Sequence, residues 1–443
     1  MVLFKNMKLT SFQVIIYGFA LLILAGTLLL MLPIATIDGS STSFLESLFT
    51  ATSATCVTGL IVHDTATYWS LFGQIVILIL IQIGGLGIVM VASLLTVLSG
   101  KKIGLMQRSA LASSISAPHL GGIIKLAKFI FRTTFFIELI GAIIMSTVFI
   151  PQFGFFQGIW YGIFHSISAF CNAGFDLMGV VSPYSSLCEY AGNPIISITI
   201  MLLIIIGGLS FMTWNDIQEH HLHFKKYSMQ SKIILTTTIV LIILPTIYYF
   251  FAEYSNEPML ERILVSFFQA VSPRTAGFNT ADLTQMSDTG EFIQIALMLI
   301  GGAPGSTAGG MKVTTFFVVI LSALSIFEHS DKTECFGRSI YEQAVRNAST
   351  IFMMYIFICL LGGCLISSID GLPIMDCFFE AASAIGTVGL TQGITPGLST
   401  ASRVILIFMM YIGRVGGLTL IYAVFPRAHE RKGSYVKESV MIG

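Results

Sequence analysis

The sequence has few charged side chains. Asp, Glu, Lys and Arg make up 10% of its 443 residues, and the formal net charge is zero. A chain without a basic excess lacks the charge that nucleic-acid binding requires. The seven cysteines are scattered and form no CxxC pair, so neither a disulfide framework nor a zinc site is indicated. Apolar residues dominate instead: 55% of the chain is hydrophobic and the mean hydropathy is +0.85, which indicates a membrane protein.

Two catalytic patterns are also missing. The Gly-rich stretch that ends at Lys312 is no nucleotide-binding P-loop, because Met311 separates Gly310 from the lysine. A Ser-Gly pair occurs at Ser99, but Val97 replaces the glycine that a serine hydrolase would need. His165 is better explained as a packing or carbonyl-bonding residue than as a catalytic base. The sequence therefore gives no support to an enzyme.

One short motif is written four times. An aromatic residue opens it, a serine lies in its middle, and a glycine followed by an apolar residue closes it. The closing glycines are separated by 115, 103 and 112 residues, so the chain is predicted to contain four repeats of about 110 residues. The four copies are FTATSATCVTGL from Phe49, FHSISAFCNAGF from Phe164, FQAVSPRTAGF from Phe268 and FEAASAIGTVGL from Phe379.

Each repeat follows the same order of long apolar span, short apolar segment, motif and second span. A span needs about 20 residues, so the short segments are predicted to be re-entrant pore helices. The expected fold is an all-α polytopic membrane protein, with eight transmembrane helices and four re-entrant pore helices around one pore of pseudo-fourfold symmetry. The predicted divisions are repeat 1 at 1–104, repeat 2 at 105–222, repeat 3 at 223–335, repeat 4 at 336–426 and a cytoplasmic tail at 427–443. The second spans are expected at 69–98, 194–214, 292–327 and 402–425.

The motifs carry few charges, which favours a site built from backbone. Glycine tolerates positive φ and lets carbonyl oxygens turn toward a ligand, and a ring of carbonyls can replace the hydration shell of a monovalent cation. For a single copy, small residues would more readily indicate tight helix packing, but four copies in register favour a filter. The third copy is one residue shorter, which makes its register the hardest to assign. The candidate filter residues are Val57, Thr58 and Gly59; Asn172, Ala173 and Gly174; Thr275, Ala276 and Gly277; and Thr387, Val388 and Gly389.

The second spans contain a further glycine signal. Three carry a Gly-Gly pair, at Gly84–Gly85, Gly207–Gly208 and Gly416–Gly417, and the third expands into IGGAPGSTAGGMK. Glycines and Pro304 interrupt a helix, and irregular backbone at membrane depth survives only inside protein or beside water. We expect a movable gate here; a kink for close helix crossing is the alternative. The candidate gate residues are Gly301, Gly302, Ala303, Pro304, Gly305, Ser306, Thr307, Ala308, Gly309, Gly310 and Lys312.

Several charges within or beside the spans need partners. Arg414 either faces the pore as an electrostatic barrier below the filter or pairs with Glu138, the acid within a span. Lys312 either anchors the gate or extends to the cytoplasm. Arg274, beside the third filter loop, is expected to point away and donate to backbone carbonyls. If the motifs face outside, 18 of the 23 Lys and Arg residues fall in cytoplasmic segments, which predicts cytoplasmic termini.

The four motifs, the GAPGSTAGGMKVTTF stretch and YIGRVGGLT together resemble the KtrB subunits of bacterial Ktr potassium uptake systems, in the Trk/Ktr/HKT superfamily. The resemblance covers essentially the whole chain. It implies a homodimer in the bacterial cell membrane, with one pore per subunit, docked on a cytoplasmic ring of nucleotide-binding RCK subunits of KtrA or KtrC type. It also implies that the tail at 427–443 contributes to the dimer contact.

The resemblance further implies potassium as the transported ion, because Gly59, Gly174, Gly277 and Gly389 match potassium-selective members. Sodium is a candidate activating ion, and ATP or ADP would bind the partner rather than this chain, for which no covalent or catalytic cofactor is expected. It places the gate at the 301–312 segment and an arginine beneath the filter at Arg414. A coupled cation symporter, or a sodium transporter of the same superfamily, is the alternative. Symporters usually have inverted repeats, whereas these four share one orientation.

Overall fold

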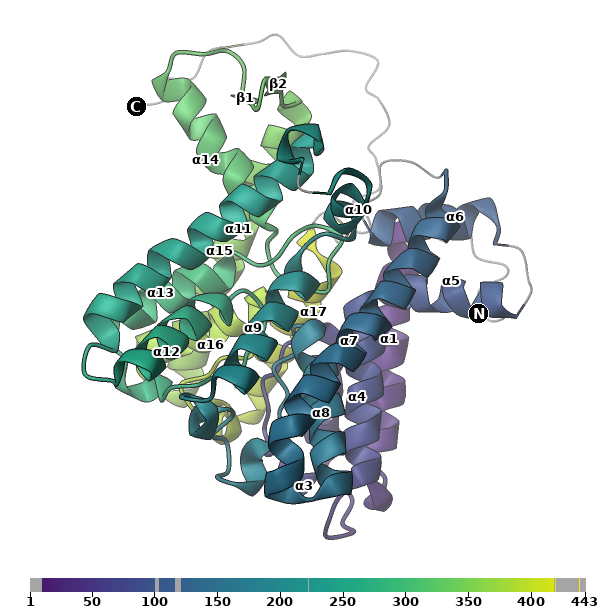
Figure 1. Ribbon diagram of the computed structural model, residues 1–443, viewed down its shortest axis with the longest axis vertical. Coiled ribbons are helices and arrows are strands. Elements are labelled where there is room, and N and C mark those ends of the chain that lie inside the picture. The colour runs from purple at the N-terminus through teal and green to yellow at the C-terminus, as the bar shows by residue number, and fades with distance from the viewer. Residues whose placement is uncertain are drawn as a thin grey trace.

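The structure is a computed structural model that describes residues 10–99, 103–115, 121–221, 223–417, 419 and 438. Within them the chain is helical apart from one two-stranded hairpin, β1 (Glu334–Cys335) with β2 (Arg338–Ser339). The predicted tail at 427–443 lies outside the described residues except for Glu438, as does most of 418–425. The longer helices build four successive units along the chain, and each unit has a first helix, a pore helix and a second helix (Figure 1).

The first helix of each repeat is long and apolar enough to cross a membrane. Thr10 caps the first of them by accepting from the Gln13 N–H. Large apolar side chains such as Leu21, Phe136 and Leu244 are exposed on these helices, as lipid-facing surfaces require. The four are α1 (Ser11–Leu30), α7 (Ile123–Phe153), α11 (Met229–Tyr248, continued by a π-helical turn Tyr249–Glu253) and α15 (Glu342–Asp370).

The pore helices are short and largely buried. Each begins soon after a first helix and ends inside a motif, before the closing glycine. Figure 1 shows α8, α12 and α16 in the same half of the molecule, away from α6 and α10. The four are α2 (Phe44–Cys56), α8 (Phe155–Phe170), α12 (Met259–Val271) and α16 (Ile374–Gly386).

The second spans are not continuous helices, so the predicted single spans at 69–98 and 194–214 are wrong. In repeat 1, α4 (Leu71–Leu86) and α5 (Ile88–Leu98) meet at 93°, and in repeat 2, α9 (Pro194–Gly208) and α10 (Phe211–His220) meet at 97°. The first bend is at Gly87, whose φ of +89° favours glycine. At the second, the Ser210 hydroxyl starts α10 by accepting from the Met212 N–H. In repeat 3, 300–312 separates α13 (Asp288–Leu299) from α14 (Val313–Phe327), and repeat 4 has α17 (Thr400–Val415).

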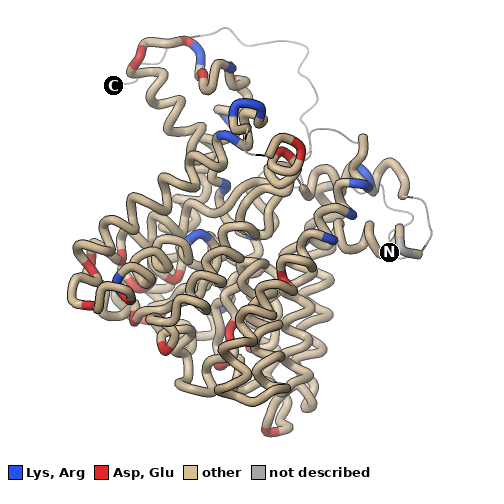
Figure 2. The backbone as a smooth tube through the Cα atoms, viewed as in Figure 1, with Lys and Arg blue, Asp and Glu red and all other residues tan. Residues whose placement is uncertain are grey.

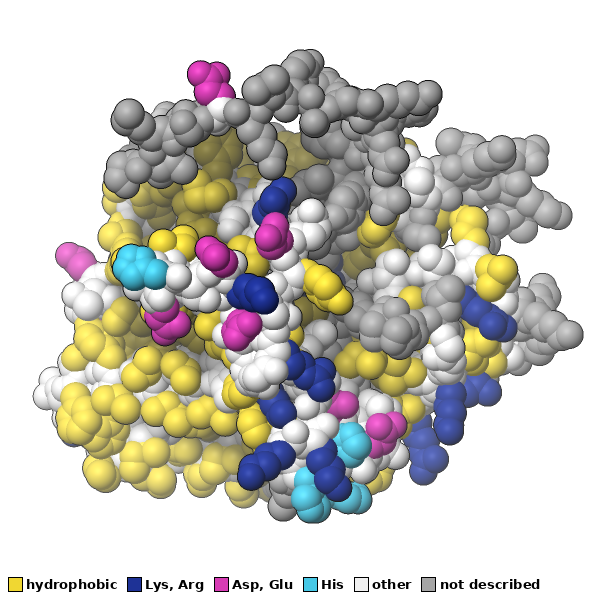
Figure 3. Space-filling view, turned by 90° about the horizontal axis from the view of Figure 1, so that it is seen from above, with side chains coloured by type: hydrophobic (Ala, Val, Ile, Leu, Met, Phe, Trp, Pro, Cys, Tyr) yellow, Lys and Arg dark blue, Asp and Glu magenta, His cyan; other side chains and the backbone are white. Residues whose placement is uncertain are grey.

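The two ends of the molecule differ in charge. Lys and Arg gather toward the end that carries α6 (Leu105–Ser114), α10 and the β1–β2 hairpin (Figure 2), and Figure 3 shows Lys, Arg and His side chains on that end, with Asp and Glu side chains between them. The short helix α3 (Thr65–Tyr68) lies at the opposite end. The all-α polytopic membrane fold is confirmed, and the basic end is the one that the charge distribution of the sequence predicts to be cytoplasmic.

Candidate functional site: a ring of four loops above an unwound segment

The four loops after the pore helices have the same backbone conformation. Two residues before each closing glycine, a non-glycine residue adopts the left-handed region, with φ between +52° and +72°. The closing glycines also have positive φ, from +69° to +96°. All twelve predicted filter residues are buried. The left-handed residues are Val57, Asn172, Thr275 and Thr387.

The serine in the middle of each motif holds the loop. Ser53 and Ser383 accept hydrogen bonds from the N–H of Gly59 and Gly389, at 3.1 and 3.0 Å. Ser168 and Ser272 instead donate to the carbonyl oxygen of the phenylalanine that follows the closing glycine. The same side chain therefore fixes the loop in every repeat, by accepting in repeats 1 and 4 and by donating in repeats 2 and 3.

The shorter third copy keeps the predicted register. In the other copies the residue before the closing glycine donates its N–H to the serine five positions earlier, as Thr58 does to the Ser53 carbonyl at 2.8 Å. In the third copy Ala276 donates to the Ser272 carbonyl, four positions earlier, at 2.9 Å. The turn of the third copy is thus one residue shorter, and Thr275 still takes the left-handed position.

The closing glycines form a closed ring. A Cβ on Gly59 would lie 3.1 Å from the Cα of Gly174, and one on Gly174 would lie 2.9 Å from the Cα of Gly277. A Cβ on Gly277 would lie 3.2 Å from the Cα of Gly389, and one on Gly389 would lie 2.9 Å from the Cα of Gly59. The loops therefore meet in the order 1, 2, 3, 4 and back to 1. Each added Cβ would also collide with a carbonyl oxygen of the next repeat: Ala173, Ala276, Val388 and Thr58.

The 301–312 segment lies directly beneath this ring. Its two ends are hydrogen-bonded to each other: the Gly301 N–H donates to the Met311 carbonyl at 2.8 Å, and the Val313 N–H donates to the Gly302 carbonyl at 3.0 Å. A Cβ on Gly309 would collide with the Thr387 hydroxyl, and one on Gly301 would lie 3.2 Å from the Thr275 methyl group. The segment is therefore seated against the filter loops of repeats 3 and 4.

Neighbouring repeats also hold the segment through backbone hydrogen bonds. Ala303 and Thr307 donate their N–H groups to the carbonyls of Gly208 and Gly207, at 3.0 and 3.2 Å. On the other side, Gly310 donates to the Gly413 carbonyl at 3.2 Å. Irregular backbone at this depth thus satisfies its polar groups inside protein.

Arg414 contacts the segment and repeat 1, not Glu138. Its guanidinium donates to the carbonyls of Thr307, Gly84 and Gly85, the last at 2.9 Å. Glu138 instead accepts from the Gln82 amide, at 3.1 and 3.3 Å to its two oxygens. The expected alternative pairing of Arg414 with Glu138 is therefore wrong, because the α4 helix supplies each of them with a different partner.

The other two cations are also placed. The Lys312 ammonium donates to the carbonyls of Ala308 and Gly309, at 2.8 and 3.2 Å. It therefore binds within the 301–312 segment rather than extending to the cytoplasm. Arg274 is buried and points away from the filter toward α11, where it donates to the Thr238 hydroxyl at 3.2 Å. The expected donation to backbone carbonyls is wrong, since a threonine hydroxyl is its partner.

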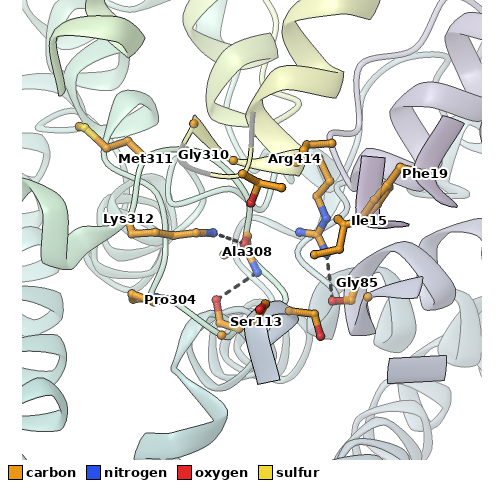
Figure 4. Close-up of a pocket in the computed structure, with 18 of the residues that line it drawn as sticks. Ile15, Phe19, Gly85, Ser113, Pro304, Ala308, Gly310, Met311, Lys312 and Arg414 are labelled. Carbon is orange, nitrogen blue, oxygen red and sulfur yellow. Dashed lines mark hydrogen bonds between the residues drawn. The ribbon is translucent and has the colours of Figure 1, made fainter. Parts of the chain in front are cut away.

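A cavity of about 340 Å³ lies on the far side of the segment from the ring (Figure 4). The segment contributes Pro304 and Ala308, α1 contributes Ile15 and Phe19, and the close-up shows the Arg414 and Lys312 side chains at its wall. Among the described residues that line it there is no Asp or Glu. The wall of the cavity therefore carries two basic side chains and no acidic one among the described residues.

The glycine pairs of the second helices pack on the pore-helix ends. Cβ atoms on Gly84, Gly207 and Gly413 would collide with the carbonyl oxygens of Thr55, Phe170 and Ile385, each four residues before a closing glycine. Gly413 is therefore the fourth-repeat equivalent of Gly84 and Gly207, although the Gly-Gly pair of that span lies three residues later, at Gly416–Gly417. Arg414 occupies the place that the second glycine takes in repeats 1 and 2.

A model of the TrkH family, described as cation transport proteins, matches residues 5–233 and 227–430. The chain belongs to the TrkH family of cation transport proteins. Membership places it among transport proteins and not among enzymes, as the sequence predicts, and confirms the resemblance to Ktr subunits at the level of the family.

Two relatives match the chain nearly end to end. The chain is 40% identical to the potassium/sodium uptake protein NtpJ of Enterococcus hirae, over 98% of both chains. It is 39% identical to the Ktr system potassium uptake protein B of Bacillus subtilis, over 99% of this chain and 98% of the other. The crystal structure of the potassium transporter TrkH from Vibrio parahaemolyticus has a TM-score of 0.75 at 18% identity, covering 95% of this chain and 86% of that one. That likeness shows a TrkH-type fold.

One row of residues in this TrkH-family chain was not recognised as a set from the sequence, although His165 by itself was expected to pack or bind a carbonyl. The residue after each motif's opening aromatic is buried: Thr50, His165, Gln269 and Glu380. Three of them bind the chain that leaves the filter: His165 accepts from the Leu177 N–H, Gln269 donates to Asn279 and Glu380 accepts from Thr391 and Thr395. The signal was present, since polar residues follow the same aromatic four times. They fasten the outer ends of the loops.

Proposed function

We propose that the chain carries potassium ions into the cell through the ring of filter loops. The observation that carries this proposal is the closed contact of Gly59, Gly174, Gly277 and Gly389, each with positive φ and each against the next repeat. A site enclosed by four such loops presents peptide oxygens to a central ion, and rings of carbonyls substitute for the hydration shell of a monovalent cation. Relatives named as potassium uptake proteins support the choice of ion.

The chemistry of the ring suits a cation. None of the twelve filter residues is charged, so selectivity would depend on backbone oxygens. The four pore helices end at the ring, and the carboxyl end of a helix dipole favours positive charge. The buried hydroxyls of Thr58, Thr275 and Thr387 have no hydrogen-bond partner among the described residues, which leaves them free to contribute oxygens.

The 301–312 segment would act as the gate. It lies between the ring and the cavity, and it is held by hydrogen bonds that a shift of the segment could break. Arg414 would add an electrostatic barrier, because a positive charge in a low-dielectric channel repels a passing cation. By fixing the Thr307 carbonyl, the same side chain would also keep the segment in the blocking position.

Regulation would come from the basic end of the molecule. With that end in the cytoplasm, α6, α10 and the β1–β2 hairpin face the side on which a nucleotide-binding RCK ring would dock. The resemblance to Ktr subunits supports a homodimer with one pore in each subunit, with nucleotide bound to the partner. Sodium is proposed as an activating ion.

The test is potassium uptake by a transport-deficient bacterial strain that expresses the chain, with and without an RCK subunit and with sodium varied. The proposal predicts potassium-dependent growth and uptake that increases with the partner and with sodium. Deletion of Gly305 to Gly310 should raise uptake and make it less dependent on the partner. No uptake under any of these conditions would contradict the function, and a deletion that leaves uptake unchanged would contradict the gate.

Sodium transport is a second candidate function, because one relative is named a potassium/sodium uptake protein. A sodium transporter would take up radioactive sodium at a rate comparable to that of potassium in the same cells. The proposal predicts a clear preference for potassium, since all four closing positions are glycine.

A further inference from the structure

The four left-handed filter residues are equivalent in backbone but not in side chain. Val57 is apolar, and the Thr275 and Thr387 hydroxyls have no hydrogen-bond partner among the residues that the structure describes. Asn172 differs, because its amide is hydrogen-bonded on both sides. Its nitrogen donates to the carbonyls of Ile204 and Arg274, at 3.5 and 3.4 Å, so the amide joins the filter loop of repeat 2 to that of repeat 3.

The oxygen of the same amide binds the segment below. The Thr307 hydroxyl lies 3.0 Å from the Asn172 amide oxygen and 3.0 Å from the Phe170 carbonyl at the end of pore helix α8. Both atoms can only accept, so the threonine donates its one hydrogen to this pair. Both Thr307 and Asn172 are buried, with 0% and 1% of their surface exposed, which protects the bond from competition by water.

The backbone N–H and carbonyl of Thr307 are also hydrogen-bonded. Its N–H donates to the Gly207 carbonyl at 3.2 Å, and its carbonyl accepts from Arg414. Arg414 in turn donates to Gly84 and Gly85 of repeat 1. One residue of the 301–312 segment thus connects repeats 1, 2 and 4 to a side chain of the filter itself.

We propose that the Thr307–Asn172 hydrogen bond couples the gate to the selectivity filter, so that displacement of the 301–312 segment releases the Asn172 amide and changes the filter's affinity for its ion. This inference rests on the proposed function. Thr307 and Asn172 are positioning residues for ion selection: Thr307 holds the amide, and the amide joins the left-handed residue of the repeat 2 loop to the Arg274 carbonyl beside the repeat 3 loop. The filter and the gate then respond as one unit rather than as two independent barriers.

Coupling of this kind predicts crossed effects. Thr307→Val removes the hydroxyl at nearly constant volume in the gate, yet it should change a filter property, the KM for potassium and the ratio of rubidium to sodium uptake. Asn172→Val installs the residue that repeat 1 has at the equivalent place, yet it should change a gate property, the dependence of uptake on the RCK partner. Loss of one buried neutral hydrogen bond corresponds to roughly 2- to 10-fold in each quantity.

Two further variants separate coupling from general damage. Thr307→Ser keeps the hydroxyl and should restore both quantities toward the unaltered protein. Ser306→Ala is the matched control, because the Ser306 hydroxyl bonds only within the segment, to the Ala303 carbonyl at 2.7 Å and the Ala308 N–H at 3.3 Å. It leaves the Thr307–Asn172 bond in place and should therefore change KM, ion preference and partner dependence less than Thr307→Val does. Elution of each purified variant from a sizing column in detergent checks that it folds.

The experiment is a double-mutant cycle of Thr307→Val and Asn172→Val, with KM, ion preference and partner dependence measured for each protein in transport-deficient cells. Coupling predicts that the effects of the two substitutions do not multiply in the double variant, because the bond that they share can be lost only once. Effects that multiply in the double variant, or a Thr307→Val change confined to the maximal rate, would overturn the inference while leaving filter and gate in place. Absence of cation uptake by the unaltered protein would instead overturn the proposed function.

Discussion

The filter ring and the layer of second helices beneath it are built from equivalent positions of the same four repeats, yet only the ring is symmetric. Each loop of the ring has a left-handed residue, a closing glycine and a serine that fixes them. Below, the equivalent stretches are IGGLG, IGGLS, IGGAP and IGRVG, and they form two sharp bends, an unwound segment and a helix end that carries an arginine.

The difference teaches how one fold can separate two tasks. Under the proposed function, a central ion would meet four equivalent walls in the ring, so one backbone conformation would serve every repeat. Opening and closing would need a part that moves relative to the others, and the layer below would supply it in repeat 3, with Arg414 of repeat 4 as its fixed partner. In repeats 1, 2 and 4 the first glycine of the stretch still packs on a pore-helix end, at Gly84, Gly207 and Gly413.

The largest effect is expected where the ring is broken. In Gly59→Ser the new Cβ would lie 2.5 Å from the Ala173 carbonyl oxygen, at a φ of +96° that disfavours any side chain. We expect the preference for potassium over sodium to fall tenfold or more, since about 1.4 kcal/mol of differential binding corresponds to tenfold. Paired uptake of rubidium and sodium measures it.

Gly393→Ser is the control for that substitution. Gly393 also has positive φ, +81°, but a Cβ there would meet nothing within 4 Å. It tests backbone strain without a collision in the ring. A Gly59→Ser protein whose ion preference equals that of Gly393→Ser would contradict the carbonyl ring.

The next effect concerns the asymmetric layer. Arg414→Ala removes both the positive charge at the cavity wall and the bonds that hold Thr307. Uptake without the partner should rise at least about tenfold, because a charge about 12 Å from the ion contributes about 1.4 kcal/mol at an effective dielectric of 20, and a closer charge contributes more. Arg414→Lys keeps the charge but not the forked geometry, so its partner-free uptake should lie between that of the unaltered protein and that of Arg414→Ala. Partner-free potassium uptake distinguishes them, and a fall in uptake by a well-folded Arg414→Ala protein would refute the barrier.

A smaller effect tests whether the ring is as symmetric in energy as in shape. Ser53→Ala, Ser168→Ala, Ser272→Ala and Ser383→Ala each remove one hydrogen bond from a loop, worth about 1 kcal/mol. Each should raise the KM for potassium by roughly fivefold. If one serine carried most of the effect, the equivalence of the repeats would be limited to geometry.

The smallest effect is expected at Glu138. Its carboxyl group accepts from Gln82 and does not meet Arg414, so Glu138→Gln should change partner-free uptake less than twofold. Partner-free uptake is compared with that of Arg414→Ala and of the variant that carries both Glu138→Gln and Arg414→Ala. A Glu138→Gln change as large as that of Arg414→Ala would restore the rejected pairing.

The repeated features and the interrupted 301–312 segment were predictable from sequence, whereas the bends of the second spans and the partners of Arg414 were not. Four glycines at similar spacing identify the ring, because the same conformation must be encoded in every copy. Gly87 gives no sign of whether its positive φ will bend a span, since that depends on how α4 and α5 pack. The partners of Arg414 were hidden for the same reason: they are backbone carbonyls of Thr307, Gly84 and Gly85, which no side-chain pattern reveals.

The most direct test is the position of a heavy alkali ion in the protein. Crystals or frozen particles prepared in rubidium or thallium should show density on the axis enclosed by Gly59, Gly174, Gly277 and Gly389, with peptide oxygens as its ligands. Density bound by carboxylates elsewhere, with none inside the ring, would contradict the account.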